Sequence, residues 1–133
     1  MPYFSIVIPA YNNERYLSEC IKSIQEQSFM DWEAVVVIDG SPDNSFSVAS
    51  ELAASDDRVK VVNKIKNEGT HLARRTGVLN STGDYIYLLD ADDSLPDGCL
   101  KLLADAIAKT DADISSQASQ ASFASRCLRI TLT

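Results

Sequence analysis

The stretch "WEAVVVIDGS", residues 32–41, joins an unbroken apolar run to an abrupt polar end. A strand that is apolar at every position, rather than at alternate ones, is typical of a parallel sheet whose two faces are covered by helices. Asp39, Gly40 and Ser41 then end the strand, because aspartate, glycine and serine favour turns. The stretch therefore predicts a buried parallel strand with polar residues at its carboxyl end.

The same succession of apolar strand and helical pattern recurs along the chain. Strands are also expected at residues 4–10, 57–64 and 85–89, and a helical pattern follows each of the four strands. The first helix is expected to begin at Asn12 or Asn13, because asparagine is a favoured N-cap. Four apolar strands alternating with four helices predict an α/β fold. Its sheet would be mostly parallel, with helices on both faces and right-handed crossovers.

The strand order 3-2-1-4 of a Rossmann-like sheet brings three polar loops to one place. The loops "PAYNN" (residues 9–13), "DGS" (residues 39–41) and "DADD" (residues 90–93) each follow the carboxyl end of a strand. Ligands of open α/β sheets bind outside these ends, at the point where the strand order switches. We therefore expect the three loops to line a single crevice.

Length, charge and cysteine content narrow the class of protein. A chain of 133 residues is enough for one compact domain with a core. Its formal charge of -7 argues against nucleic acid or an anionic membrane surface as a partner, because both would repel it. Cys20, Cys99 and Cys127 lack the spacing of a zinc site or a closed disulfide framework, so a cytoplasmic location is expected. No run approaches the ~20 apolar residues of a membrane span.

Three carboxylates, Asp90, Asp92 and Asp93, follow the strand at residues 85–89. Ionised neighbours in a partly buried site repel one another by roughly several kcal/mol unless a cation or a proton joins them. The sequence has no glycine-rich dinucleotide or P-loop motif. A diphosphate can instead be held through a divalent metal, Mn²⁺ or Mg²⁺. Asp92 and Asp93 are the expected metal ligands, because hard cations prefer carboxylate oxygens. An ordinary acidic turn is the alternative.

Two residues of the other loops suit a nucleoside. Asp39 can accept hydrogen bonds from a base or a ribose, because an ionised carboxylate is an acceptor only. Tyr11, beside Asn12 in the loop after the first strand, offers an aromatic face on which a base can stack. The three loops thus combine groups for a base, a ribose and a metal-bridged diphosphate.

Four ordered segments resemble those of a known enzyme family. "SIVIPAYNNERYLSECIKSIQEQSF" resembles the family's opening strand and helix, "VVVIDGSPDNS" its second-strand motif, "NEGTHLARRTG" its glycine and arginine segment, and "GDYIYLLDADDSLPDGCL" its DxD segment. Over roughly residues 4–110, the chain is similar to the N-terminal, nucleotide-sugar-binding part of an inverting family 2 glycosyltransferase of the GT-A fold.

The resemblance implies roles for residues of the crevice. Pro9, Tyr11 and Asp39 would surround the nucleotide base. Asp90 would contact the ribose side, and Asp92 would bind the metal that bridges the diphosphate. The full set expected to bind the nucleotide sugar is Pro9, Tyr11, Asn12, Asp39, Gly40, Ser41, Arg74, Asp90, Ala91 and Asp92.

Other positions are less closely defined by the resemblance. Asp93 would assist at the metal, while Arg74 would lie near the phosphates or form an ion pair with an acid of the site. Ile38 stands where many members carry a further aspartate, which weakens the assignment of the base pocket, and Arg75 stands where asparagine is usual. The family's acceptor-binding half and its catalytic base have no counterpart before Thr133, so the catalytic residue is unassigned.

The implied function is a metal-dependent, inverting transfer of a sugar from a nucleotide diphosphate sugar. The expected donor is a UDP-sugar, and the acceptor is a hydroxyl of a carbohydrate or a lipid-linked molecule in cell-envelope polysaccharide synthesis. A non-catalytic nucleotide-sugar-binding fragment is one alternative. A phosphatase of the haloacid dehalogenase type is a weaker one: "LLDADDS" nearly fits its nucleophile motif, but that motif normally opens the domain on the first strand.

A change of composition divides the chain near residue 113. Residues 1–113 are expected to form the nucleotide-sugar-binding domain, an incomplete GT-A unit. Residues 114–133 are a Ser/Ala/Gln-rich tract without Asp, Glu or Lys, and we expect a truncated or out-of-frame tail without regular elements. The segment "DADIS", residues 111–115, at this boundary is a candidate start for a fifth strand.

Overall fold

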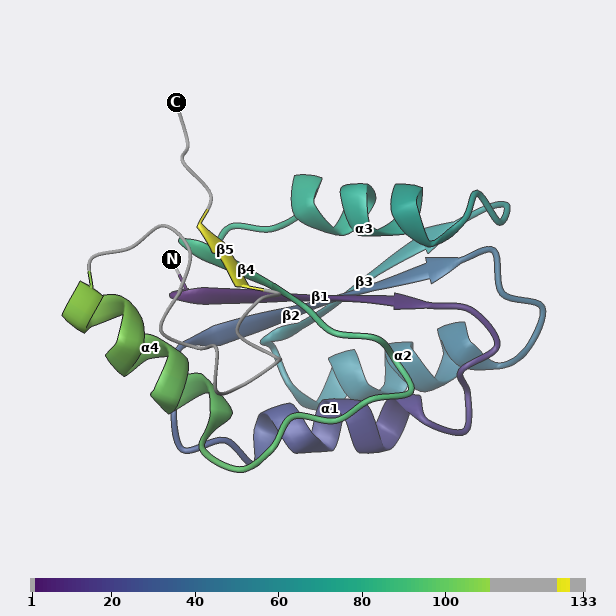
Figure 1. The fold of residues 1–133 in the computed structure, drawn as a ribbon. Coiled ribbons are helices and arrows are strands. Elements are labelled where there is room, and N and C mark those ends of the chain that lie inside the picture. The colour runs from purple at the N-terminus through teal and green to yellow at the C-terminus, as the bar shows by residue number, and fades with distance from the viewer. Residues whose placement is uncertain (1, 111–126, 130–133) are drawn as a thin grey trace.

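The computed structural model describes residues 2–110 and 127–129. These residues form an α/β unit, with helices and strands in alternation up to residue 110 (Figure 1). The segment "DADIS" (residues 111–115) and most of the 114–133 tract lie outside the described residues. No helix in the described part of the chain is long and apolar enough to cross a membrane.

The elements are β1 (Phe4–Ala10), α1 (Leu17–Gln25), β2 (Trp32–Asp39), α2 (Ser45–Ser55), β3 (Val59–Lys64), α3 (Thr70–Leu79), β4 (Tyr85–Leu88), α4 (Cys99–Thr110) and β5 (Cys127–Arg129).

The sheet has the order β3-β2-β1-β4-β5, and its first four strands are parallel. The register places Pro9 of β1 beside Val37 of β2, and Val7 of β1 beside Leu88 of β4. The predicted order 3-2-1-4 is confirmed. β5 pairs antiparallel with β4, within the tract where no regular element was expected. Three residues are too few to show a strand periodicity in sequence.

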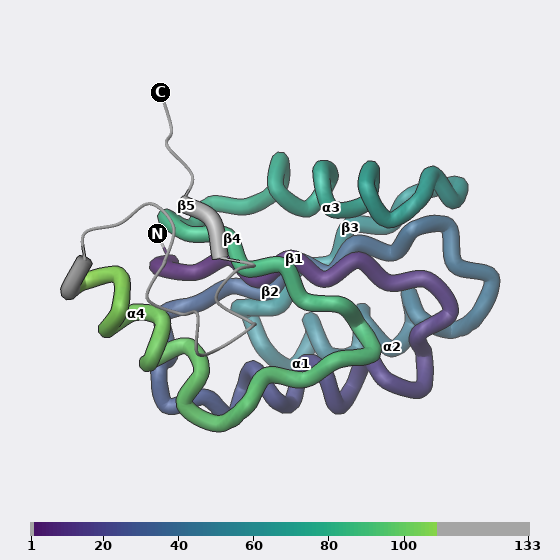
Figure 2. Tube along the Cα trace, in the orientation of Figure 1, coloured from purple at the N-terminus to yellow at the C-terminus, as the bar shows by residue number. Residues whose placement is uncertain are grey.

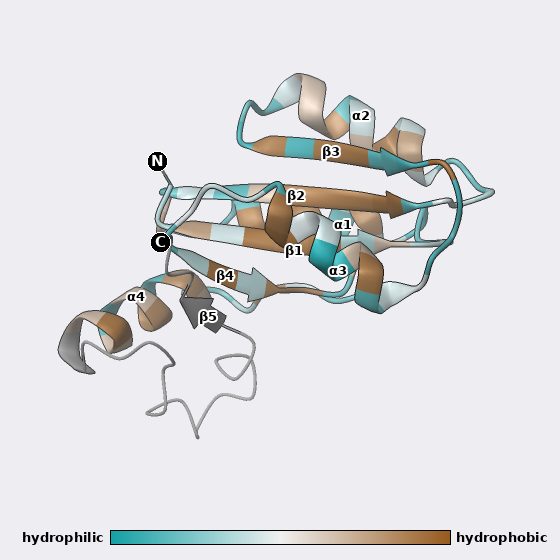
Figure 3. Cartoon of the chain, turned by 90° about the horizontal axis from the view of Figure 1, so that it is seen from above, coloured by the Kyte–Doolittle hydropathy of each residue, from teal (hydrophilic) through white to brown (hydrophobic). Residues whose placement is uncertain are grey.

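Helices cover both faces of the sheet, as predicted. α1 and α2 lie on one face, and α3 lies on the other (Figure 1). The first face holds the larger core, in which Ile6, Ile8 and Val36 pack in one cluster with side chains of α1 and α4. A smaller cluster, which includes Val35 and Val37, packs against α3. Most of β2 is hydrophobic (Figure 3), because its side chains are buried on both faces.

A glycine allows α3 to approach the sheet closely. A Cβ at Gly77 would lie 2.3 Å from Cγ1 of Val7 and 3.3 Å from Cγ2 of Val37. A larger side chain would force the helix away from β1 and β2. Because α3 also carries Arg74, this contact sets where Arg74 stands above the sheet.

The first helix begins at Leu17, later than the predicted start at Asn12 or Asn13. The residue before the helix, Tyr16, makes no side-chain cap hydrogen bond. Oδ1 of Asn13 accepts the N–H of Tyr11 (2.8 Å), so this asparagine closes a turn of its own loop instead of capping the helix. Its carbonyl accepts the N–H of both Tyr16 and Leu17, each at 3.0 Å. The loop after β1 is therefore longer than expected.

A buried polar cluster lies at the amino ends of the strands. Glu33, which is only 4% exposed, accepts hydrogen bonds from Oγ of Ser5 (2.5 Å) and from N–H and Oγ1 of Thr82 (2.6 and 3.0 Å). Nζ of Lys60 lies 2.5 Å from the same carboxylate. Burial raises the pKa of Glu33, but the bonds from Lys60, Ser5 and Thr82 outweigh it and lower the pKa. This end of the sheet is thereby held independently of the loops at the carboxyl ends.

Candidate functional site

A cleft of about 420 Å³ opens at the carboxyl ends of β1, β2 and β4. The three predicted loops all contribute to it, and the start of α3 adds a further wall. The parallel sheet thus brings together segments that lie far apart in the sequence, as the strand order predicts. The lining residues are Pro9, Ala10, Tyr11, Asn13, Asp39, Thr70, Arg74, Asp90, Ala91 and Asp92.

Sequence reasoning missed Ala10, Asn13 and Thr70. Ala10 and Asn13 belong to the same segment as Pro9 and Tyr11, so selecting all of residues 9–13 would have found them. Thr70 is the first residue of α3, and no chemical motif singles it out. Only the placement of α3 over the strand ends brings Thr70 into the cleft.

Three predicted residues, Asn12, Gly40 and Ser41, lie outside the cleft lining. The N–H of Asn12, whose φ of 56° is left-handed, donates to Oγ of Ser41 (3.0 Å). Gly40 also has a left-handed φ, of 61°, and a Cβ there would lie 2.2 Å from the backbone nitrogen of Asn67, so only glycine fits. These residues shape the two loops, and direct contact with a nucleotide sugar stays a prediction for them.

Asp43 ties the loop after β1 to the loop after β2. Its carboxylate accepts hydrogen bonds from Oγ of Ser41, from the N–H of Ser45 (3.1 Å) and from the N–H of Glu14 (3.2 Å). Burial raises the pKa of Asp43, but these hydrogen bonds outweigh it and lower the pKa to about 2. The ionised carboxylate therefore stabilises the walls of the cleft.

We expect Asp43→Asn to lower the free energy of unfolding by about 1 kcal/mol at pH 7, a value discounted for solvent screening of a part-exposed group. A lowered folded-state pKa gives stability that is present above the unfolded-state pKa and is lost as the pH falls toward about 2. The difference between wild type and variant should therefore shrink between pH 4 and pH 2 in urea unfolding. The control is Asp97→Asn, at an exposed aspartate. If the difference in free energy of unfolding between wild type and Asp43→Asn did not depend on pH, the lowered pKa assigned to Asp43 would be contradicted.

Asp39 ends β2 at the cleft and is only 3% exposed. Its Oδ1 accepts the N–H of Glu68 and its Oδ2 accepts the N–H of Gly69, both at 3.0 Å. An ionised carboxylate has about four lone-pair sites, so acceptor capacity remains for a ligand. Asp39 thus anchors the connection between β3 and α3 and also presents an acceptor at the cleft.

Arg74 pairs with Asp90 at the cleft. Nη2 of Arg74 lies 3.2 Å from Oδ1 of Asp90, and both residues line the cleft. Of the two alternatives that the sequence left open, the structure shows the ion pair with an acid of the site. A guanidinium carries five N–H donors, so this single bond still leaves donors for a bound anion.

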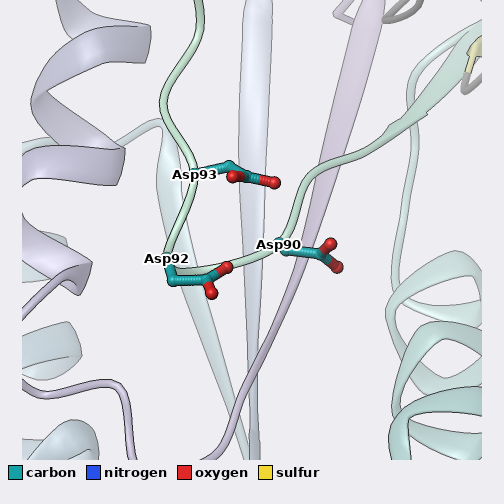
Figure 4. Close-up of side chains that lie close together, drawn as sticks. All are labelled: Asp90, Asp92 and Asp93. Carbon is teal, nitrogen blue, oxygen red and sulfur yellow. The ribbon is translucent and has the colours of Figure 1, made fainter.

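The acidic cluster of Asp90, Asp92 and Asp93 lies on the loop between β4 and α4 (Figure 4). One carboxylate oxygen from each residue lies within 4.8 Å of the others, and the three side chains turn to the same side. Asp92 and Asp93 are exposed, and Asp90 is half-buried. Clustered carboxylate oxygens are the donor set that a hard divalent cation prefers, so these residues fit Mg²⁺ or Mn²⁺.

A family model described as Glycosyl transferase family 2 matches residues 5–127. The chain belongs to this family. This family 2 glycosyltransferase chain is 33% identical over 110 residues to glycosyltransferase GlyG of Streptococcus pneumoniae, covering 83% of this chain and 36% of GlyG. It is 36% identical over 104 residues to the GalNAc(5)-diNAcBac-PP-undecaprenol beta-1,3-glucosyltransferase of Campylobacter jejuni, covering 77% of this chain and 34% of that enzyme. The chain thus spans about a third of the length of these relatives.

Solved structures share the fold of the family 2 chain. The crystal structure of S. aureus TarS in complex with UDP matches with a TM-score of 0.77 at 29% identity, over 84% of this chain and 33% of that one. The mannosyltransferase PcManGT from Pyrobaculum calidifontis, in complex with GDP-Man and Mn²⁺, matches with a TM-score of 0.71 at 26% identity, over 80% of this chain and 31% of that one. The expected family and the GT-A fold of the nucleotide-binding part are confirmed.

Proposed function

We propose that this chain binds the donor of an inverting glycosyltransferase, a UDP-sugar, through a divalent metal. The observation that carries the proposal is the shared cleft, in which a buried acceptor at Asp39 and the acidic residues Asp90 and Asp92 line one space. The acceptor at Asp39 suits a nucleoside, and the acidic residues suit a metal-bridged diphosphate. The similarity to TarS, solved with UDP, and to PcManGT, solved with GDP-Man and Mn²⁺, supports the same arrangement.

The nucleoside would lie between the loops after β1 and β2. The side chain of Tyr11 is 44% exposed and lines the cleft beside Pro9, so its ring is available to stack on a base. Asp39 would accept a hydrogen bond from the base, because a buried ionised carboxylate makes a strong acceptor. Asp90 would face the ribose with the oxygen atom that Arg74 leaves unpaired.

The diphosphate would lie at the acidic cluster. Asp92 and Asp93 would hold Mn²⁺ or Mg²⁺, which when bound offsets the negative charge that develops on the leaving diphosphate. Arg74, already placed at the cleft by its ion pair with Asp90, adds a positive charge near the same position. This chain's own part in the reaction is therefore to orient the donor and to present its leaving group.

The general base is proposed to lie outside the described residues. The proposed reaction needs a general base that removes a proton from the acceptor hydroxyl within hydrogen-bond reach, and the family resemblance implies a carboxylate. After Asp93, the described acids Asp97 and Asp105 are exposed and do not line the cleft.

We propose a carbohydrate or lipid-linked acceptor, as the name of the C. jejuni relative suggests for that enzyme. A chain that binds a nucleotide sugar without turnover is the second candidate function.

The proposed setting is the cytoplasm. Cys20 and Cys99 are free thiols and are buried, which fits a reducing compartment.

Thermal unfolding with a nucleotide panel tests the choice of donor. In the presence of Mn²⁺, we expect UDP to raise the melting temperature more than GDP, CDP or ADP does at the same concentration. A ligand that binds only the folded chain stabilises it more, the tighter it binds. A larger rise in melting temperature with GDP than with UDP would indicate that the donor carries GDP. If none of the four nucleotides changed the melting temperature, the proposed donor site would be wrong.

A further inference from the structure

The acidic cluster sits on a loop with few backbone ties. β4 ends at Leu88 and α4 begins at Cys99, and the loop between them runs out past the sheet and returns along α1 (Figure 2). The N–H of Leu89 donates to the carbonyl of Val7 (3.0 Å), and the N–H of Asp93 donates to the carbonyl of Asp90 (3.0 Å). The first bond holds only the start of the loop, and the second lies within it. Other contacts must fix its far end.

Side chains from α1 and the residues just after it provide those contacts. Sγ of Cys20 donates to the carbonyl of Asp90 (3.8 Å), and Oγ of Ser23 accepts the N–H of Leu95 (2.9 Å). Burial, followed by the charges of the acidic cluster, raises the pKa of the Cys20 thiol to about 12, so the thiol keeps the proton that it donates. The loop is thus bonded to α1 at Asp90, the first residue of the acidic cluster, and at Leu95, just after the cluster.

Gln27 makes the most extensive of these contacts. Its amide is only 4% exposed, and Nε2 donates to the carbonyls of Pro96 (2.8 Å) and Ser23 (3.1 Å). Its Oε1 accepts the N–H of Leu100 (3.1 Å), one of the first N–H groups of α4, which have no partner within the helix. One side chain therefore caps α4 and holds the end of the acidic loop against α1.

We propose that Gln27, assisted by Ser23, is a positioning residue that holds the acidic loop in the arrangement that binds the divalent metal. The proposal rests on the proposed function, in which Asp92 and Asp93 hold that metal. Carboxylates within 4.8 Å repel one another when no cation is bound, and a loosely held loop would spread to separate them. The hydrogen bonds between Gln27 and the backbone of Pro96 and Leu100 oppose this spreading before a metal binds. Groups that hydrogen-bond a metal ligand directly change metal affinity by about 10- to 100-fold. Gln27 acts through the backbone of the loop, at Pro96 and Leu100, so we expect an effect at the lower end of that range.

The test is the Mn²⁺ affinity of the 133-residue chain, measured by calorimetry with UDP present. Gln27→Met keeps the length of the side chain and removes its hydrogen bonds, and Ser23→Ala removes the bond to Leu95. We expect Gln27→Met to weaken Mn²⁺ binding about tenfold and Ser23→Ala to weaken it less. The affinity for uridine in EDTA should stay within about twofold for both variants, because Asp39 and Tyr11 lie on other loops.

Ser5→Ala is the matched control, because it removes buried hydrogen bonds to Glu33 and Gly83 at the amino ends of the strands. It should lower stability and leave Mn²⁺ affinity unchanged. Equal Mn²⁺ affinity in wild type, Gln27→Met and Ser23→Ala would overturn the positioning role while leaving the metal site in place. Absence of Mn²⁺ binding by the wild type would overturn the proposed function and this role with it. If Gln27→Met does not fold, Ser23→Ala decides the question, and an unchanged affinity overturns the proposal.

Discussion

Asp92→Ala is expected to abolish the metal-dependent part of UDP binding. Asp92 lines the cleft, is exposed and belongs to the acidic cluster, so its loss removes a charged oxygen donor from the proposed metal site. Affinity for UDP with Mn²⁺ should fall at least about tenfold, because even outer partners of a metal ligand change affinity by 10- to 100-fold. Calorimetric titration of UDP into the variant, with Mn²⁺ or with EDTA, measures the change. The two curves should coincide for Asp92→Ala.

Two further variants control this result. Asp97→Ala removes an exposed aspartate that follows the cluster, and it should leave the metal dependence intact. Asp93→Ala should have an intermediate effect, because Asp93 belongs to the cluster but does not line the cleft. If Asp92→Ala retained the full metal dependence of the wild type, the metal would have to bind elsewhere.

Asp39→Ala is expected to weaken uridine binding even in the absence of metal. The loss of a buried charged acceptor typically costs about 1.5 to 3 kcal/mol, which corresponds to a more than tenfold lower affinity. The same substitution leaves the N–H groups of Glu68 and Gly69 without their acceptor, so the connection between β3 and α3 should also loosen. Titration with uridine in EDTA measures the first effect, and urea unfolding measures the second.

Asp39→Asn separates binding from stability. Asparagine keeps one carbonyl oxygen that can accept one of the two backbone N–H groups, and it lacks the negative charge. Stability should therefore recover in part, while uridine affinity should stay low. An unchanged uridine affinity in both variants would remove Asp39 from the base pocket and leave it with the loop-anchoring role alone.

The core of this fold could be predicted because its two central strands, β1 and β2, are largely apolar. Residues 34–38 of β2 are all buried, as expected for a strand of a parallel sheet with helices on both faces. β5 could not be predicted, because its partner is β4 and a three-residue strand has no pattern of its own. The start of α1 was predicted too early, because Asn13 bonds the N–H of Tyr11 instead of capping the helix.

The cleft was largely predictable because the chemistry of its residues is local. Asp90 and Asp92 follow a strand end directly, and parallel strands bring their carboxyl ends to one edge. The residues behind the cleft were not predictable in their roles. The bond from Asn12 to Ser41 spans 29 residues and the bond from Gln27 to Leu100 spans 73, and no periodicity relates residues at such distances. Only the folded structure brings these residues together to hold the loops.

The central claim is that the chain holds a nucleoside diphosphate through a divalent metal at the acidic loop. Calorimetric titration of UDP into the wild-type chain, once with Mn²⁺ and once with EDTA, tests it most directly. The charges of Asp90, Asp92 and Asp93 repel a bare diphosphate, so we expect an affinity with Mn²⁺ that is at least about tenfold higher than with EDTA. Equal affinity in the two titrations, or tighter binding in EDTA, would contradict the claim.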